Sequence, residues 1–240
     1  MLRRVLLATI LIVIFASCSA QSAPVQRPPM TYVSLGDSLA VGVGSSEPDH
    51  RGYAPLLRER FSRDTGREVR LVQLGVSGET SASLVGGYPD RETSQLARAR
   101  EALKEYPGAT VTLSIGGNDL LRTAGEDDQA RRDAVSRYGQ NLDFILKTLN
   151  GSSRPAPRIT VLALYNPAPG SFTDKWSRRL NDEIRTTASR NGVAVADGDR
   201  TFEGHAAQYT HYTRETPDIH PTDRGYEALT RAFARTFSKA

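Results

Sequence analysis

The sequence predicts an α/β fold in which a five-stranded parallel sheet carries helices on both faces. Five short segments are rich in β-branched residues and apolar on both sides, as strands buried on two faces are. Longer segments with a helical spacing of apolar residues separate them, so that strand and helix alternate along the chain. This alternation is typical of a parallel sheet, because each crossover to the next strand is usually made by a helix.

The predicted strands are short, and the first three end in glycine. They occupy residues 31–36, 69–75, 110–117, 158–164 and 192–197. The predicted helices show apolar residues at steps of three or four. The strongest patterns cover residues 135–149, 176–188 and 226–237, and weaker ones cover 53–63 and 92–106. Thr222 stands where the last of these helices needs its N-cap.

The N-terminal residues do not follow this pattern. Arg3 and Arg4 precede a short apolar run over residues 5–16, and small residues follow it. A basic start, a short apolar run and a small-residue exit are typical of an export signal, whereas a membrane-spanning helix needs about 20 apolar residues. We therefore expect residues 1–18 to be an export signal and residues 19–30, which are rich in proline and polar residues, to be a tether.

The single cysteine, Cys18, lies at the end of this signal. The sequence FASC resembles a bacterial lipobox, whose cysteine is lipidated and becomes the new N-terminus, although Phe15 stands where leucine is usual. The chain is then expected to be exported and anchored to the outer face of the cell membrane. Cleavage after Ala20, which would release a secreted protein, is the alternative. Neither product contains a disulfide within the chain, because there is no second cysteine.

The remaining residues, 31–240, suit one domain with a substantial core. The formal net charge is +4, and basic residues are interspersed with acidic ones rather than collected in a run with aromatic side chains. This distribution argues against nucleic-acid binding. We expect a monomer that acts on a small molecule or on a glycan or lipid, with a membrane surface as a partner through the anchor.

Residues suited to catalysis follow the predicted strands where the strands end. GDS follows the first strand, GVSGETS the second and GGND the third, and DIHPTDRGY opens the last helix. Ligands of parallel sheets bind beyond the carboxyl ends of the strands. Ser38, Gly78, Asn118 and His220 are therefore predicted to converge on one rim of the sheet. The loop at 165–172 is expected at the same rim, where it either shapes a substrate pocket or serves only as a turn.

These residue types indicate nucleophilic catalysis by a serine. A serine hydroxyl is a weak nucleophile unless a base removes its proton, and His220 is the histidine placed to act as that base. The imidazole needs a partner that fixes its tautomer, and Asp218 is the nearest carboxylate. The N–H groups of Ser38 and Gly78 and the side-chain amide of Asn118 would stabilise the oxyanion of a tetrahedral intermediate.

The four segments also resemble a known family. GDSL at 36–39, GVSGETS at 75–81, GGND at 116–119 and DIHPTDRGY at 218–226 occur in the order and spacing of the GDSL, or SGNH, hydrolases. The resemblance covers essentially the whole mature domain. It implies a flavodoxin-like three-layer α/β/α sandwich, the SGNH hydrolase fold, and ester hydrolysis without a metal or an organic cofactor.

The resemblance implies the same roles residue by residue, with one departure. Ser38 corresponds to the nucleophile, Gly78 and Asn118 to the oxyanion donors, and His220 to the base. The family's acid usually lies three residues before the histidine, and Pro217 occupies that position here. Either Asp218, two residues before His220, reaches the imidazole through a different local turn, or a backbone carbonyl orients the ring instead.

A metal site is not expected. His205, His211, His220 and Asp218 have spacings that match no compact metal-ligand motif. The expected function is therefore a serine ester hydrolase that works through an acyl-enzyme. Its substrate is a short-chain carboxylic ester, a lysophospholipid or an O-acetylated carbohydrate, with a lean toward a short acyl chain because no long apolar insertion suggests a lid. An acyltransferase with the same site, or a non-catalytic envelope-binding protein of the same fold, is the alternative.

Overall fold

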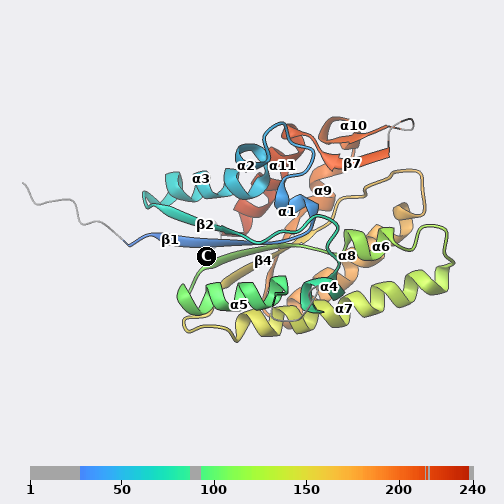
Figure 1. Cartoon of the computed structure of the whole chain (residues 1–240). Helices are drawn as coiled ribbons and strands as arrows, with labels where there is room; N and C mark the ends of the chain where they lie inside the picture. The colour runs from blue at the N-terminus through green and yellow to red at the C-terminus, as the bar shows by residue number, and fades with distance from the viewer. Residues whose placement is uncertain (1–27, 87–92, 214, 216, 238–240) are drawn as a thin grey trace, which may run out of the picture.

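The computed structural model describes residues 28–86, 93–213, 215 and 217–237. Its centre is a five-stranded sheet with the strand order β2-β1-β3-β4-β5, in which every neighbouring pair is parallel. Helices cover both faces of the sheet (Figure 1). The predicted α/β fold with a five-stranded parallel sheet is therefore confirmed.

The strands lie where the sequence placed them, within three residues at each end. They are β1 (Met30–Gly36), β2 (Val69–Gln73), β3 (Thr110–Ser114), β4 (Arg158–Ala163) and β5 (Ala194–Asp197). Apart from their first residues, β1, β3 and β4 are buried along their whole length, whereas β2 and β5 at the edges are only partly buried. Burial on two faces thus holds for the central strands and not for the edges.

The helices form two layers, seen above and below the sheet in Figure 1. One layer contains α1 (Ser38–Val41), α2 (Pro48–Arg51), α3 (Tyr53–Thr65), α9 (Gly198–Phe202) and α11 (Asp223–Phe237). The other contains α4 (Ser81–Gly86), α5 (Gln95–Glu105), α6 (Gly117–Leu121), α7 (Asp128–Asn150) and α8 (Thr173–Arg190). Thr222 caps α11 as predicted, since its Oγ1 accepts a hydrogen bond from Gly225 N at 3.3 Å.

Hydrogen bonds between buried hydroxyl groups join β1, β3 and α3. The Tyr32 hydroxyl lies 2.8 Å from Thr112 Oγ1, and the Tyr53 hydroxyl lies 3.1 Å from Ser114 Oγ. Both tyrosines are fully buried, and buried hydroxyls need such partners. The network fixes the ends of the two central strands from which the site is built.

A small antiparallel hairpin, β6 (Thr210–Tyr212) and β7 (Pro217–Pro221), lies outside the main sheet. A short helix, α10 (Ala206–Tyr209), leads into it. The sequence analysis placed this region only at the start of the last helix. Strands this short, with a proline at each end of β7, carry no alternating pattern that a sequence reading can detect.

The predicted export signal, Cys18 and most of the tether lie outside the described residues, so these assignments stay predictions. Among the helices of the described ranges, none combines the length and the apolar character needed to cross a membrane.

Candidate active site

A pocket lies at the carboxyl ends of β1, β3 and β4, where the sequence predicted the site. We call it the rim pocket. Ser38, Asn118 and His220 all line it. Most of the other lining side chains are apolar, namely Leu39, Leu120, Leu121, Leu164, Tyr165, Pro167, Leu180 and Ile219. Its cavity volume is about 40 Å³, which is room for only a small group.

Ser38 is positioned by a tight turn at the end of β1. Gly36 has φ +137°, and a Cβ there would lie 2.0 Å from Ser114 O, so only glycine fits. Asp37 then caps α1, with its Oδ1 accepting a hydrogen bond from Leu39 N at 3.0 Å. Ser38 is the first residue of that helix. The N-cap of α1 is thus Asp37, which leaves the Ser38 side chain free of the capping role.

Burial raises the pKa of Asp37 to about 7. The hydrogen bond from Leu39 N partly opposes this effect, and the neighbouring carboxyl groups of Asp119 and Glu79 add to it. The side chain is 3% exposed, and an ionised carboxylate is costly in such a place. Asp37 is therefore a capping residue that titrates near neutral pH.

Asp218 reaches the imidazole despite its shorter sequence spacing. His220 Nδ1 lies 2.7 Å from Asp218 Oδ1, and His220 N donates to the same oxygen at 3.0 Å. Burial raises the pKa of Asp218, but the hydrogen bonds from His220 outweigh it and leave the pKa below its ordinary value. An ionised Asp218 holds the Nδ1–H tautomer of the ring, so Nε2 is the nitrogen left to exchange a proton.

Two further contacts hold the backbone around His220. The Tyr165 hydroxyl donates to Ile219 O at 2.7 Å. Gly44 has φ +94°, and a Cβ there would lie 2.7 Å from His220 Cβ, so the loop after α1 packs directly against the histidine. Gly44 was not identified from the sequence as part of the site, and Tyr165 was predicted there only as part of the loop at 165–172. Both act over long sequence separations, which a linear pattern does not reveal.

Asn118 and the loop containing Gly78 are joined to each other. Asn118 Nδ2 donates to Glu79 O at 2.8 Å, and Arg122 Nη2 donates to Gly78 O at 3.2 Å. Asp119 accepts hydrogen bonds from Ser81 N at 2.9 Å and from Ser81 Oγ at 2.5 Å. The structure thus places Gly78 beside Asn118, although Gly78 is not one of the residues that line the rim pocket.

The remaining histidines do not join this arrangement as metal ligands. His211 Nε2 lies 2.7 Å from Gly44 O, and the ring of His205 stacks on Tyr209 with 5.1 Å between the ring centres. Within the described residues, no three His, Cys, Asp or Glu side chains gather closely enough to hold a metal ion.

The sequence analysis missed the part of the pocket lining that comes from a helix rather than from the ends of the strands. Leu180 and Ser177 reach the rim pocket from α8. The spacing of Leu180 with Trp176 and Ile184 identified it only as a core residue of that helix. Pro167, from the loop at 165–172, does line the rim pocket. That loop therefore shapes the pocket, which was one of the two outcomes that the sequence left open.

Comparisons with known proteins give a family match and a similar sequence. The family model described as "GDSL-like Lipase/Acylhydrolase family" matches residues 34–228. The chain is 29% identical over 212 residues to the spore germination lipase LipC of Bacillus licheniformis, covering 83% of this chain and 92% of that protein.

Solved structures share the fold. The lipase Lip_vut3 from a goat rumen metagenome superposes with a TM-score of 0.67 and 26% identity, covering 86% of this chain and 96% of that one. Axe2, an acetylxylan esterase from Geobacillus stearothermophilus, gives a TM-score of 0.66 at 16% identity, covering 88% of this chain and 95% of that one. The second likeness shows the fold alone.

Proposed function

The chain belongs to the GDSL-like lipase/acylhydrolase family and is a carboxylic ester hydrolase, and from this premise we propose that it works through a serine acyl-enzyme. Ser38 is the nucleophile, His220 the general base and acid, and Asp218 the residue that orients His220. The observation that carries the proposal is the His220–Asp218 hydrogen bond of 2.7 Å beside a pocket that Ser38 and His220 both line.

The proposed reaction begins with attack of Ser38 Oγ on the ester carbonyl carbon. His220 Nε2 takes the hydroxyl proton, because Nδ1 is already bonded to Asp218. Collapse of the tetrahedral intermediate breaks the ester C–O bond, and His220 gives its proton to the leaving alcohol. Water then attacks the acyl-enzyme with His220 again as base, which releases the carboxylic acid and restores Ser38.

Three donors are proposed to bind the oxyanion. Ser38 is the first residue of α1, so its main-chain N–H has no intrahelical acceptor. Asn118 Nδ2 carries two hydrogens, and its bond to Glu79 O uses one of them. The N–H of Gly78, in the loop bonded to Asn118, is the third donor. Loss of one such donor typically costs about 3–4 kcal/mol of barrier.

The volume of the rim pocket supports a short acyl chain. Each water needs about 10–15 Å³ of such volume, so about 40 Å³ suits an acyl group of a few carbons. The apolar lining suits the alkyl part of such a group. Short-chain carboxylic esters and carbohydrate O-acetyl groups are thus favoured over lysophospholipids. One relative is named as a lipase and one structural neighbour as an acetylxylan esterase. The alcohol part of the substrate is therefore proposed to be either that of a lipid or simple ester or that of a carbohydrate.

We also propose that the enzyme is exported, is anchored through a lipidated Cys18 and acts as a monomer. The support for export and anchoring is the sequence of the N-terminal 18 residues. Expression in a bacterial host with radiolabelled palmitate should label the wild type and not Cys18→Ser. Label in neither protein would favour cleavage after Ala20 and a secreted enzyme.

A fluorophosphonate probe tests the serine mechanism. The wild type should gain one covalent adduct on the peptide that contains Ser38, and Ser38→Ala should gain none. A product analysis with and without an added acceptor alcohol then separates hydrolysis from acyl transfer. Labelling that is equal in both proteins would remove Ser38 from the mechanism.

A further inference from the structure

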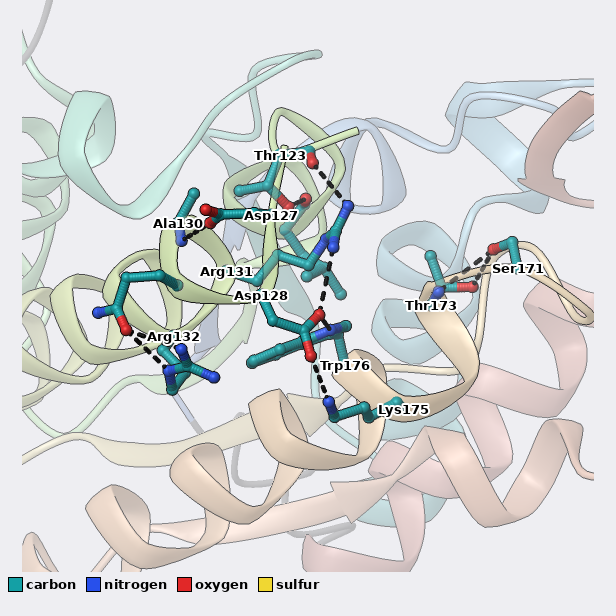
Figure 2. Close-up of polar contacts among 12 residues, drawn as sticks. Thr123, Asp127, Asp128, Ala130, Arg131, Arg132, Ser171, Thr173, Lys175 and Trp176 are labelled. Atoms are coloured by element: carbon teal, nitrogen blue, oxygen red, sulfur yellow. Dashed lines mark hydrogen bonds and ion pairs between the residues drawn. The ribbon is translucent and has the colours of Figure 1, made fainter. Parts of the chain in front are cut away.

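A cluster of polar contacts joins the N-terminal ends of α7 and α8 (Figure 2). Asp128 Oδ1 accepts hydrogen bonds from Trp176 Nε1 at 3.2 Å and from Arg131 Nη1 at 3.3 Å, and Oδ2 accepts one from Lys175 Nζ at 2.5 Å. The Arg131 guanidinium also lies 4.8 Å from the centre of the Phe172 ring. We call these five residues, Asp128, Arg131, Phe172, Lys175 and Trp176, the α7–α8 clasp.

The α7–α8 clasp combines an exposed ion pair between Lys175 and Asp128, whose side chains are 51% and 47% exposed, with a buried donor on Trp176 and a half-buried one on Arg131. Trp176 is 2% exposed, and the Arg131 side chain is 12% exposed. Arg131 Nε is buried and, within the described residues, has no hydrogen-bond acceptor. Removal of the Asp128 carboxylate would also leave the Trp176 N–H without its acceptor. Because unpaired buried donors are unfavourable, the two helix ends would then separate to admit water.

One end of the α7–α8 clasp is connected to the apolar wall of the rim pocket. Arg131 Nη2 donates to Thr123 O at 3.4 Å, and Thr123 Oγ1 donates to Leu120 O at 2.6 Å. Leu120 and Leu121, at the end of α6, line the rim pocket. Arg131 therefore holds this wall through the turn that follows α6.

The α8 side of the α7–α8 clasp is connected to other residues that line the rim pocket. Thr173, the first residue of α8, has its Oγ1 2.6 Å from Asn166 Oδ1 and 2.8 Å from Ala168 O. These two contacts bracket Pro167, and Ser177 lies one turn further along α8. Pro167 and Ser177 both line the rim pocket. The α7–α8 clasp is therefore connected to two sets of residues that line the rim pocket, one at the end of α6 and one around the start of α8.

We propose that the α7–α8 clasp sets the width of the rim pocket and thereby limits the length of the acyl chain that the enzyme accepts. Asp128 is the positioning residue, since it receives the hydrogen bonds from both helices. This inference rests on the proposed function, in which the rim pocket holds the acyl group. Release of the clasp should favour longer acyl chains relative to acetate and leave the chemistry at Ser38 intact.

The test compares Asp128→Ala with Asp143→Ala. Asp143 also lies on α7 and bonds to Lys147 Nζ of α7 at 2.6 Å and to Nδ2 of Asn191, the C-cap of α8, at 2.9 Å. None of these three residues lines the rim pocket. We would measure kcat/KM for p-nitrophenyl acetate, butyrate, hexanoate and octanoate. Asp128→Ala should raise the hexanoate-to-acetate ratio about tenfold, a typical effect of fitting one more methylene. The kcat of Asp128→Ala for p-nitrophenyl acetate should stay within about twofold of wild type. The hexanoate-to-acetate ratio of Asp143→Ala should also stay within about twofold of wild type.

A folded Asp128→Ala with an unchanged ratio would overturn the proposal, as would an equal change in Asp143→Ala. If Asp128→Ala fails to fold, Trp176→Phe is the second variant, because it removes the Nε1–H donor and keeps an aromatic ring at that position. Its hexanoate-to-acetate ratio should rise about threefold. An unchanged ratio in this variant also overturns the proposal. Failure of the proposed function gives a different result, because the fluorophosphonate probe would then not label Ser38 in the wild type. Labelling of Ser38 with unchanged ratios rejects the α7–α8 clasp alone.

Discussion

The two catalytic residues proposed at the rim pocket, Ser38 and His220, differ in the structure that surrounds them. Ser38 follows a central strand of the main sheet, next to Asp37, which is 3% exposed. His220 lies on the hairpin of β6 and β7 outside that sheet, where its side chain is 26% exposed and that of Asp218 is 41% exposed. The nucleophile is fixed by close packing of the backbone, whereas the histidine is fixed by a few side-chain contacts.

This difference predicts two kinds of response to substitution. Removal of hairpin side chains that contact His220 should lower activity and leave the free energy of unfolding nearly unchanged, since the hairpin contributes little to the core. Changes beside Ser38 should alter stability, because that side is part of the core. Four substitutions test the contrast, from the largest expected effect to the smallest.

Asp218→Ala should give the largest loss of activity. Without the carboxylate, His220 loses the acceptor that holds its Nδ1–H tautomer, and we expect kcat to fall by about 10²–10⁴. The free energy of unfolding should change by less than about 1 kcal/mol, because the side chain is 41% exposed and lies on a hairpin outside the main sheet. Steady-state kinetics and urea unfolding measure both quantities. A fall in kcat of less than about threefold, or roughly 0.7 kcal/mol of barrier, would mean that Asp218 is not the partner.

Asp37→Asn should change the pH dependence of stability. An unfolded Asp ionises near its ordinary pKa of 3.8, whereas Asp37 in the folded protein keeps its proton up to about pH 7. Between these two pH values ionisation of Asp37 lowers the free energy of the unfolded state and not that of the folded state. The wild type should therefore lose about 4 kcal/mol relative to Asp37→Asn between pH 4 and pH 7 and no more above that.

The control for this experiment is Asp127→Asn. Asp127 caps α7 in the same way, with its Oδ1 accepting from Ala130 N at 2.8 Å, but it is exposed. Urea unfolding at several pH values should give a profile parallel to that of the wild type. Parallel profiles for the wild type and Asp37→Asn would mean that Asp37 ionises in the folded state as it does in the unfolded chain.

Gly44→Ala should disturb His220 by steric contact. A methyl group there would lie 2.7 Å from His220 Cβ at a backbone φ of +94°, so the histidine has to move, and we expect kcat to fall by about 10–100-fold. Gly66→Ala is the matched control, because Gly66 has φ +63° and no atom within 4 Å of the added methyl. Gly66→Ala should lose about 1 kcal/mol of stability from backbone strain, and Gly44→Ala should lose more, because its methyl group would also lie 2.7 Å from Pro221 O. Equal kcat values in the two variants would show that the loop does not position His220.

Tyr165→Phe should have the smallest effect. It removes the hydrogen bond to Ile219 O and keeps the ring, which stacks on Phe202 at 4.3 Å between ring centres. A single hydrogen bond of this kind contributes about 1 kcal/mol, so kcat should fall by about fivefold with little change in KM. A change in KM alone would place Tyr165 in substrate binding rather than in the support of His220.

The features predictable from the sequence are those encoded by local patterns. The strands and the long helices follow from apolar periodicity, and GDS and GGND were placed correctly because the carboxyl ends of parallel strands share one rim. The partner of His220 was left open, since Asp218 lies two residues away and only the backbone turn of β7 decides whether its carboxylate reaches the ring. Gly44 and Asp128 were missed because their contacts join distant parts of the chain, and Tyr165 was predicted at the rim only as part of the loop at 165–172.

A crystal structure of the phosphonate adduct tests the central claim most directly. The phosphorus should be bonded to Ser38 Oγ, with the phosphoryl oxygen about 3 Å from the nitrogens of Ser38, Gly78 and the Asn118 side chain. His220 Nε2 should lie within hydrogen-bond distance of Ser38 Oγ. An adduct on another residue, or a His220 ring turned away from Ser38, would contradict the account.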